Sequence, residues 1–117
     1  MTTHATAPTT NYVSFMLVRT TTAWLKLTPP ERFGWLNETI RPLLERHGGV
    51  SMRFFDSEAF NARFSDVVMW ETADINLYQN VVEALRETEF WGTYFEVVEI
   101  VTSIENAYAA YYGVEAY

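Results

Sequence analysis

Three segments of this chain each predict a β-strand with apolar side chains on both of its faces. Residues 12–19 (YVSFMLVR), 65–72 (SDVVMWET) and 94–102 (YFEVVEIVT) are rich in β-branched and aromatic residues, and their apolar side chains occupy successive positions. Since neighbouring side chains of a strand point to opposite faces, a sheet built from these segments is apolar on both faces. Each face therefore needs a cover, which excludes a sheet with one face in water.

A first helix is predicted to begin after Thr28. The sequence Thr-Pro-Pro-Glu at 28–31 matches a capping box, with prolines in the first turn. Pro42 lies within this helix and predicts a kink or a break near Glu38, and glycines 48 and 49 end it. Its apolar stripe comprises Phe33, Leu36, Ile40, Leu43 and Leu44.

The second half of the chain predicts a hairpin, a helix, a strand and a short last helix. Residues 50–56 form a strand that pairs antiparallel with 65–72 through a loop too long for a tight turn. Asp74 caps a helix that runs to about residue 86 with the apolar stripe Tyr78, Val81, Val82 and Leu85. Residues 20–27 are predicted as a loop, and residues 105–113 as the last helix.

The resulting order, β-α-β-β-α-β, predicts a ferredoxin-like α+β fold: a four-stranded antiparallel sheet with both helices on one face. The second apolar face then requires a partner, and the simplest partner is an identical sheet across a two-fold axis. We therefore predict a homodimer of the dimeric α+β barrel type. The chain of 117 residues suits one domain at 12–113, with a disordered tail at 1–11 and a C-terminal tail at 114–117.

Composition restricts the partners. The formal net charge is -7, with 15 acidic against 8 basic residues, which argues against DNA, RNA or anionic membranes as ligands. No apolar run approaches the roughly 20 residues that cross a bilayer. The chain has no cysteine, hence no disulfide, thiolate nucleophile or cysteine-bound metal, and this fits a cytoplasmic protein.

An Arg-Phe-x-Asp pattern occurs twice, at 53–56 and at 63–66. If Phe55 faces Asp66 across the hairpin, Arg53 and Asp66 share a face beneath the helices. Arg53 could then hold a substrate carboxylate or enolate while Asp66 orients the guanidinium or moves a proton. The alternative is structural: the ion pairs Arg53–Asp66 and Arg63–Asp56 pin the hairpin and its loop.

Aromatic residues could line a pocket for a flat organic ligand. The candidates are Trp24, Trp70, Tyr78, Trp91 and Tyr94, of which the two tyrosines could donate to a developing oxyanion. Ordinary core and dimer packing is the alternative for each ring.

Outside the predicted tail, His47 is the only histidine. It could act as a general base, or simply cap the first helix. One histidine does not support a zinc or haem site, so no metal or cofactor is predicted.

Long segments of the chain resemble the darcynin family of small bacterial proteins. The resemblance lies in LVRTTTAWLKL (17–27), VSMRFFDSEAFNARFSDVVMWET (50–72) and ALRETEFWGTYFEVVEIVTSIENAY (84–108), and with the first helix it spans about 12–113. It implies the ferredoxin-like fold and the dimeric barrel, and it supplies no established activity. Dimeric α+β barrels as a class include monooxygenases, cyclases, isomerases, haem-handling enzymes and sensors, so function does not follow from the fold.

Three functions remain open. The first is a cofactor-independent cyclase, isomerase or monooxygenase that acts on a small, flat organic or aromatic substrate, as in bacterial secondary metabolism. The second is a dimeric sensor or sequestering protein without turnover. The third is a fully packed structural dimer, which a cavity beneath the helices would exclude.

Overall fold

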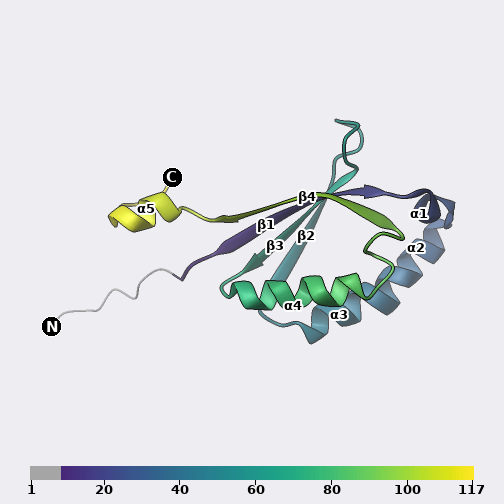
Figure 1. The fold of residues 1–117 in the computed structure, drawn as a ribbon, viewed down its shortest axis with the longest axis horizontal. Coiled ribbons are helices and arrows are strands. Elements are labelled where there is room, and N and C mark those ends of the chain that lie inside the picture. Colours follow the sequence, from purple (N-terminus) through teal and green to yellow (C-terminus); the bar gives the residue numbers. More distant parts are fainter. Residues whose placement is uncertain (1–8) are drawn as a thin grey trace.

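A computed structural model describes residues 9–117 and shows the predicted ferredoxin-like α+β fold (Figure 1). Residues 1–8, which hold most of the predicted tail and His4, lie outside the described part. The sheet is antiparallel with the order β2-β3-β1-β4. The elements are β1 (Tyr12–Thr20), α1 (Thr22–Lys26), α2 (Pro29–Trp35), the π-helix η1 (Leu36–Ile40), α3 (Arg41–Arg46), β2 (Val50–Asp56), β3 (Asp66–Thr72), α4 (Ile75–Arg86), β4 (Phe95–Ile104) and α5 (Ala107–Tyr112).

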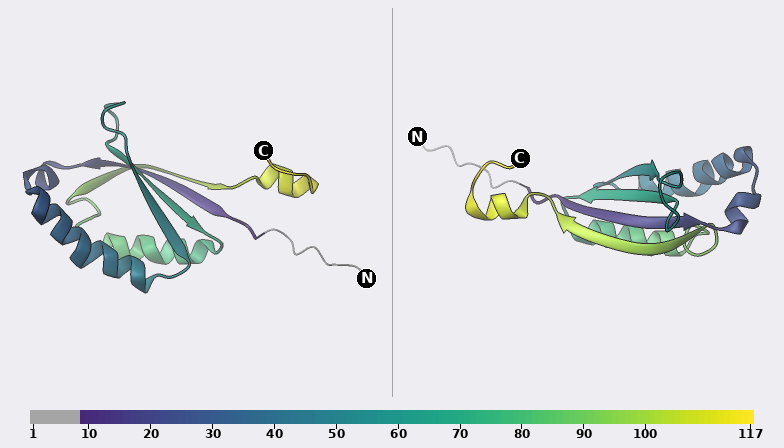
Figure 2. Two further views of the ribbon diagram at one scale, coloured as in Figure 1. Left: turned by 180° about the vertical axis from the view of Figure 1, so that it is seen from behind. Right: turned by 90° about the horizontal axis from the view of Figure 1, so that it is seen from above.

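The helices from α2 to α3 and helix α4 cover one face of the sheet (Figures 1 and 2). The core lies between these layers and is built from every second residue of the two central strands. Met16 and Val18 of β1 and Val68 and Trp70 of β3 are at most 2% exposed. They belong to one cluster with Leu43, Val81 and Leu85 from the helices. Full burial stabilises each such side chain by about 1.5–3 kcal/mol, so this layer holds the helices on the sheet.

The first long helix begins and breaks where the sequence predicts. The Thr28 hydroxyl accepts a hydrogen bond from the Glu31 N–H, and the Glu31 carboxylate accepts one from the Thr28 N–H, which completes the capping box. The helix then widens into the π-helix η1, where the Arg41 N–H donates to the Leu36 carbonyl, five residues back. Pro42 follows at once and has no N–H to continue a regular ladder, so the break lies beside it.

One part of the predicted stripe of this helix is wrong. Phe33 was expected on the inner face, but its side chain is 65% exposed, whereas Ile40 and Leu43 are buried. An α-helix turns about 100° per residue, and the π-helix between these positions inserts the equivalent of an extra residue. The residues before the π-helix are therefore rotated relative to those after it, and Phe33 faces outward.

Residues 20–27 were predicted as a loop, but they contain the short helix α1. The Thr21 side chain caps it by accepting from the Trp24 N–H, at 3.3 Å. A helix of five residues is too short to show an apolar period, and its threonine-rich start favours an extended chain. Helix α1 matters because it carries Trp24 to the end of the sheet.

The second face of the sheet has no cover within the described chain. Phe15 of β1, Phe55 of β2 and Val101 of β4 lie on it and are 38%, 40% and 45% exposed. We call this surface the open face. The strands are thus apolar on both faces, as predicted, and the helices cover only one.

Strand β4 continues past the helical layer into α5, which projects away from the body (Figures 1 and 2). Tyr108, Tyr111 and Tyr112 on this helix are 60–82% exposed. We call residues 105–117 the C-terminal arm. Within residues 9–117, no helix is long and apolar enough to cross a membrane.

Gly49→Ala is expected to lower the free energy of unfolding by about 1–3 kcal/mol. Gly49 has φ +86°, and a Cβ there would lie 2.7 Å from Leu77 Cδ1. Its carbonyl also accepts from the Thr72 hydroxyl, which ties the end of the first helix to β3. The matched control is Gly48→Ala, where a Cβ meets nothing within 4 Å. Urea denaturation measures both, and equal stabilities would show that the turn relaxes without cost.

Candidate functional site

The pairing of β2 with β3 decides which side chains face the helices. Phe55 pairs with Val67, and Asp56 pairs with Asp66. The predicted register, with Phe55 opposite Asp66, is therefore wrong by one residue. Because a shift of one residue reverses every side chain of a strand, Arg53 lies on the open face and Asp56 takes the place beside Asp66.

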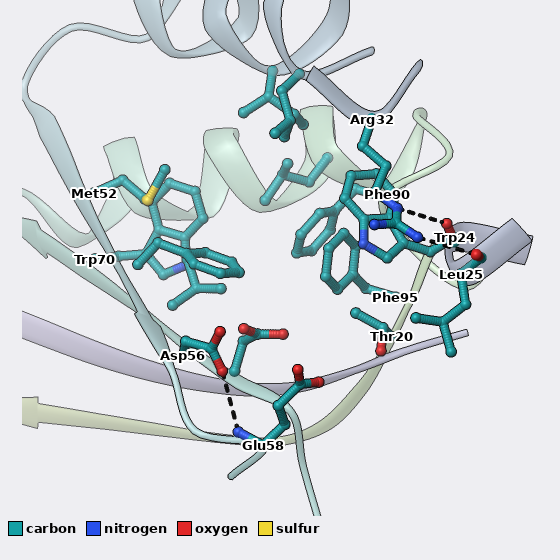
Figure 3. A pocket seen from close by; sticks show the side chains of 16 residues that line it. Thr20, Trp24, Leu25, Arg32, Met52, Asp56, Glu58, Trp70, Phe90 and Phe95 are labelled. Atoms are coloured by element: carbon teal, nitrogen blue, oxygen red, sulfur yellow. Dashed lines mark hydrogen bonds between the residues drawn. The ribbon is translucent and has the colours of Figure 1, made fainter. Parts of the chain in front are cut away.

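A cavity of about 440 Å³ lies between the helix-facing side of the sheet and the helices. Its wall is apolar and aromatic except for Thr20 and four charged side chains (Figure 3). This cavity in the single chain does not match the third function considered from the sequence, which requires a fully packed structure without a cavity. The lining residues are Thr20, Trp24, Leu25, Arg32, Leu36, Ile40, Met52, Phe54, Asp56, Glu58, Asp66, Val68, Trp70, Leu85, Phe90 and Phe95.

One end of the cavity is formed by an aromatic cluster. The Trp24 ring lies 5.1 Å from Phe95, and Phe95 stacks on Phe90 at 4.9 Å between centroids. Trp35 and Tyr94 support Trp24 from behind, with centroids 5.6 Å and 5.4 Å from it. Such contacts hold rings in fixed orientations, so this end presents a rigid apolar wall.

Three carboxylates line another part of the cavity, those of Asp56, Glu58 and Asp66; Figure 3 labels the first two. Asp66 is only 7% exposed. Burial raises the pKa of Asp66 above its ordinary value, and the negative charges of Asp56 and Glu58 act in the same direction; the hydrogen bond from Ser65 opposes them. A carboxyl group that keeps its proton to a higher pH than usual suits general acid and base catalysis.

Ser65 fixes the position of Asp66. Its hydroxyl donates to Asp66 Oδ2 at 2.7 Å and accepts from the Thr20 N–H at 2.9 Å. The Ser65 N–H in turn donates to the Val18 carbonyl at 2.9 Å. Asp66 is thus held by the central strand β1 through its neighbour, on the rigid part of the sheet.

Arg32 is the only cation of the lining within the described residues, and its guanidinium is already engaged. Its Nε and Nη2 donate to the carbonyls of Trp24 and Leu25, at 3.1 Å and 3.0 Å. The guanidinium carbon also lies 5.9 Å from the Trp24 ring centroid. Arg32 lies beside the aromatic cluster, away from Asp56 and Glu58 (Figure 3).

Of the predicted catalytic residues, only Asp66 reaches the cavity. Arg53 stacks on Phe55, with 5.1 Å from its guanidinium carbon to the ring centroid, so the predicted Arg53–Asp66 pair does not form. His47 is the C-cap of α3 and does not line the cavity. The predicted clamp between Arg63 and Asp56 is also wrong, since Arg63 pairs with Glu99 at 3.7 Å.

Of the predicted ligand-binding aromatics, Trp24 and Trp70 line the cavity. Tyr94 lies behind Trp24 instead, with its ring centroid 5.4 Å away. The Tyr78 hydroxyl accepts from Ser14 at 3.0 Å, and Trp91 lies under Arg86, with 5.4 Å between guanidinium carbon and ring. These last three side chains have structural contacts and no place in the cavity wall.

Several cavity residues were not identified as site residues from the sequence: Arg32, Met52, Phe54, Asp56, Glu58, Phe90 and Phe95. For β2 the signal was present. If Asp56 is placed opposite Asp66, the two-residue period of a strand puts Phe54 and Met52 on the same, helix-facing side as Asp56. Phe90 lies in the turn after α4, where no period marks which side chains point inward. Among the described residues, no group of three or more His, Cys, Asp or Glu side chains is arranged to hold a metal ion.

The whole chain matches one protein family. The family model described as "Darcynin, domain of unknown function" matches residues 1–117. The chain belongs to the darcynin family. A darcynin homolog of Streptomyces avermitilis is 48% identical over 103 residues, which cover 87% of this chain and 85% of that relative. Darcynin 1 of Acinetobacter baumannii is 34% identical over 88 residues, or 74% of this chain and 98% of that one.

Two larger proteins of known structure have the same fold as this darcynin. A haem-binding protein of Thermus thermophilus has a TM-score of 0.72 at 18% identity, over 92% of this chain and 46% of that one. Chlorite dismutase of Candidatus Nitrospira defluvii, in complex with imidazole, has a TM-score of 0.68 at 12% identity, over 80% of this chain and 39% of that one. This chain thus spans less than half of either. At such identities the likeness shows the fold alone.

Proposed function

We propose that this darcynin binds a small, flat organic molecule in the cavity between sheet and helices, and that Asp66 transfers a proton to or from it. The observation that supports the proposal is a buried carboxyl group with a raised pKa in the wall of an aromatic cavity of about 440 Å³. Buried titratable groups in clefts mark functional sites more often than exposed ones do. The reaction class is a cofactor-independent isomerisation or cyclisation, or an oxygenation in which O₂ is the second substrate and oxidant.

In this mechanism Asp66 takes a proton from an acidic C–H or O–H group of the substrate and returns it at a second position. Ser65 holds Oδ2 of the carboxylate, and Oδ1 receives no hydrogen bond from the residues the structure describes. The aromatic wall excludes water and keeps the ring of the substrate in place against Phe95 and Trp24. The proton returns without a redox step, so the residues present are sufficient for an isomerisation or a cyclisation.

Haem binding by a protein of the same fold raises the question of whether this cavity could hold haem. The lining residues do not fit it. His47 lies outside the wall, and no cysteine exists in the chain, so the usual proximal ligands are lacking. The carboxylates of Asp56, Glu58 and Asp66 would also repel haem propionates. We therefore route no step through haem.

A ligand-binding protein without turnover is the second candidate. The observation that favours it is the exposure of Asp56 and Glu58, which leaves the acidic side of the cavity open to solvent. A sensor or sequestering protein needs the aromatic wall and has no need of Asp66 as an acid. The two candidates therefore differ in the effect of replacing Asp66. Turnover is lost if the protein is an enzyme, whereas ligand binding is kept if it is a binding protein.

We further propose that the protein is a homodimer through the open face. Phe15, Phe55 and Val101 form an apolar centre on this face, and the ion pairs Arg19–Glu96 and Arg63–Glu99 lie towards one end of β4. An apolar centre with charges at its margin is the composition of a protein interface. The exposed tyrosines of the C-terminal arm need cover as well, and a second copy supplies it for both arms by symmetry.

Phe54→Ala is expected to weaken ligand binding about tenfold, because it removes one aromatic wall of the cavity. A thermal-shift screen with small aromatic compounds first identifies a ligand of the wild-type protein, and calorimetry then compares dissociation constants. Phe54 is 49% exposed, so the variant keeps its fold.

The matched control for this variant is Phe55→Ala, the next residue on the same strand, 40% exposed and on the open face. It is expected to leave the affinity for the ligand unchanged. Equal affinities of both variants and the wild type would place the ligand elsewhere and contradict the proposed cavity.

A further inference from the structure

The cavity that the proposed function assigns to the ligand carries an unbalanced charge. Three carboxylates line it, and the guanidinium of Arg32, which offsets one of them formally, donates to two backbone carbonyls of α1. Asp56 and Glu58 are close in the chain, and Asp56 Oδ1 accepts from the Glu58 N–H at 3.3 Å. Neither carboxylate forms an ion pair with a described residue. Their side of the cavity is thus an uncompensated negative region next to aromatic rings.

A second polar group in the wall lacks a partner, and it is a donor. Trp70 is 1% exposed, and its indole Nε1 has no hydrogen-bond partner among the described residues. Trp70 lines the cavity, and Figure 3 shows its five-membered ring, with the nitrogen, on the side of the indole nearer to Asp56. The nitrogen itself has almost no accessible surface, so a ligand atom reaches it only when the side chains packed around it shift. Leaving a buried N–H unpaired costs about 1–3 kcal/mol, and a ligand atom that accepts from it after such a shift gains affinity.

The acidic region and the Trp70 indole lie at different positions along β3. Asp66 and Trp70 are both helix-facing residues of β3, four positions apart, which corresponds to about 13 Å between their Cα atoms. Asp56 faces Asp66 across the hairpin, and Met52 faces Trp70. A ligand that reaches both features has a donor at one end, an acceptor at the other and an apolar body between them.

From these observations we infer that the ligand is a small aromatic amine: a protonated nitrogen lies against Asp56 and Glu58, and a hydroxyl or carbonyl oxygen accepts from Trp70. This inference rests on the proposed function of the same cavity and deepens it by naming the class of ligand. Cations also interact favourably with the faces of aromatic rings, and Phe54, on the same strand as Asp56, is an aromatic residue of the cavity lining. Anionic aromatic acids meet the carboxylates and are disfavoured.

The test uses four probes that share one frame: tyramine, 4-ethylphenol, 3-(4-hydroxyphenyl)propionate and phenethylamine. Calorimetry with the full-length protein at neutral pH and low salt gives each dissociation constant. Tyramine is expected to bind about tenfold more tightly than 4-ethylphenol, because its ammonium group is attracted by the carboxylates of the cavity. The propionate is expected to bind more weakly than either, because its carboxylate is repelled by them. Phenethylamine, which lacks the hydroxyl group, is expected to bind several-fold more weakly than tyramine.

Two double variants test which carboxylates cause the preference for the amine. Asp56→Asn with Glu58→Gln is expected to reduce the preference for tyramine over 4-ethylphenol to about twofold or less. Glu96→Gln with Glu99→Gln changes the net charge by the same amount on the open face and is expected to keep the preference.

The outcomes separate the two proposals. Binding of 4-ethylphenol or the propionate as tight as that of tyramine, with Phe54→Ala weakening each, would overturn the inference about the amine and keep the cavity as the binding site. Equal affinities of tyramine and phenethylamine would overturn the role of Trp70. Absence of binding by all four probes at millimolar concentration would overturn the amine inference and count against the proposed function itself.

Discussion

Phe15→Asp is expected to convert the proposed dimer into a folded monomer. Phe15 lies on the central strand β1 at the middle of the open face, and its side chain is 38% exposed in a single chain. If a second sheet covers this face, the substitution buries a carboxylate without a partner, which costs several kcal/mol. Since each 1.4 kcal/mol changes a constant tenfold, the dissociation constant should rise at least about 100-fold.

Analytical ultracentrifugation across micromolar concentrations measures this change. The fold should survive, because the neighbouring side chains Met16 and Ser14 that face the helices are untouched. The matched control is Phe33→Asp, an exposed phenylalanine on α2, which is expected to remain dimeric. A wild-type protein that sediments as a monomer, or a Phe15→Asp variant that stays dimeric, would contradict the open face as the interface.

The proposed dimer also accounts for the shape of a single chain. Its principal extents are 63 × 32 × 20 Å, because β4 and the C-terminal arm reach beyond the body (Figure 2). A helix of six residues with three exposed tyrosines does not form a stable unit by itself in water. In the proposed dimer, we expect the association that covers the open face to cover the exposed tyrosines of both arms as well.

The sequence predicts the fold well because its signals are local. The capping box at Thr28, the N-cap at Asp74 and the break beside Pro42 each depend on residues a few positions apart, and all three are present in the structure. The four strands were also found, since runs of β-branched and aromatic residues mark them without reference to the rest of the chain. Helix α1 was missed because five residues carry too short a pattern.

The site was harder to predict because it depends on a non-local quantity, the register of β2 against β3. Strand β3 is apolar on both faces, so its hydrophobic pattern does not distinguish two pairings one residue apart. In β2, Val50, Met52 and Phe54 alternate with Ser51 and Arg53, but Phe55 breaks this alternation next to the loop. The loop between them is too long to fix it by turn geometry. The error of one residue replaces Asp56 by Arg53 next to Asp66 and thereby reverses the sign of charge in the cavity.

Asp66→Asn is expected to lower turnover by about 10²–10⁴-fold if Asp66 is the acid or base. The amide keeps the shape of the side chain and can still accept from the Ser65 hydroxyl, but it cannot exchange a proton. Turnover is measured with a substrate found among the ligands of the cavity, with kcat and KM determined separately. Asp56→Asn is the comparison, since it is expected to raise KM with little effect on kcat.

The same variant has an expected effect on stability that needs no substrate. The folded protein raises the pKa of Asp66 above its ordinary value of 3.8, mainly through burial, so the native state holds this proton to a higher pH than the unfolded chain does. The free energy of unfolding therefore falls as the pH rises from about 3.8 through the pKa of the folded state. Asp66→Asn removes that loss, and it should melt at a higher temperature than the wild type at pH 7.

Thermal unfolding of both proteins from pH 3 to pH 8 tests this difference directly. The gap in melting temperature should close at the acidic end, where the carboxyl group is protonated in both states, and widen towards neutral pH. Asp74→Asn is the control, because this exposed N-cap carboxylate lies outside the cavity. A variant that gains stability and loses turnover shows that the carboxyl group is retained for chemistry at a cost to folding. A variant that loses stability at pH 7 would show that Asp66 is a structural anchor of Ser65 and the strand β1, and would leave ligand binding without proton transfer as the function of the cavity.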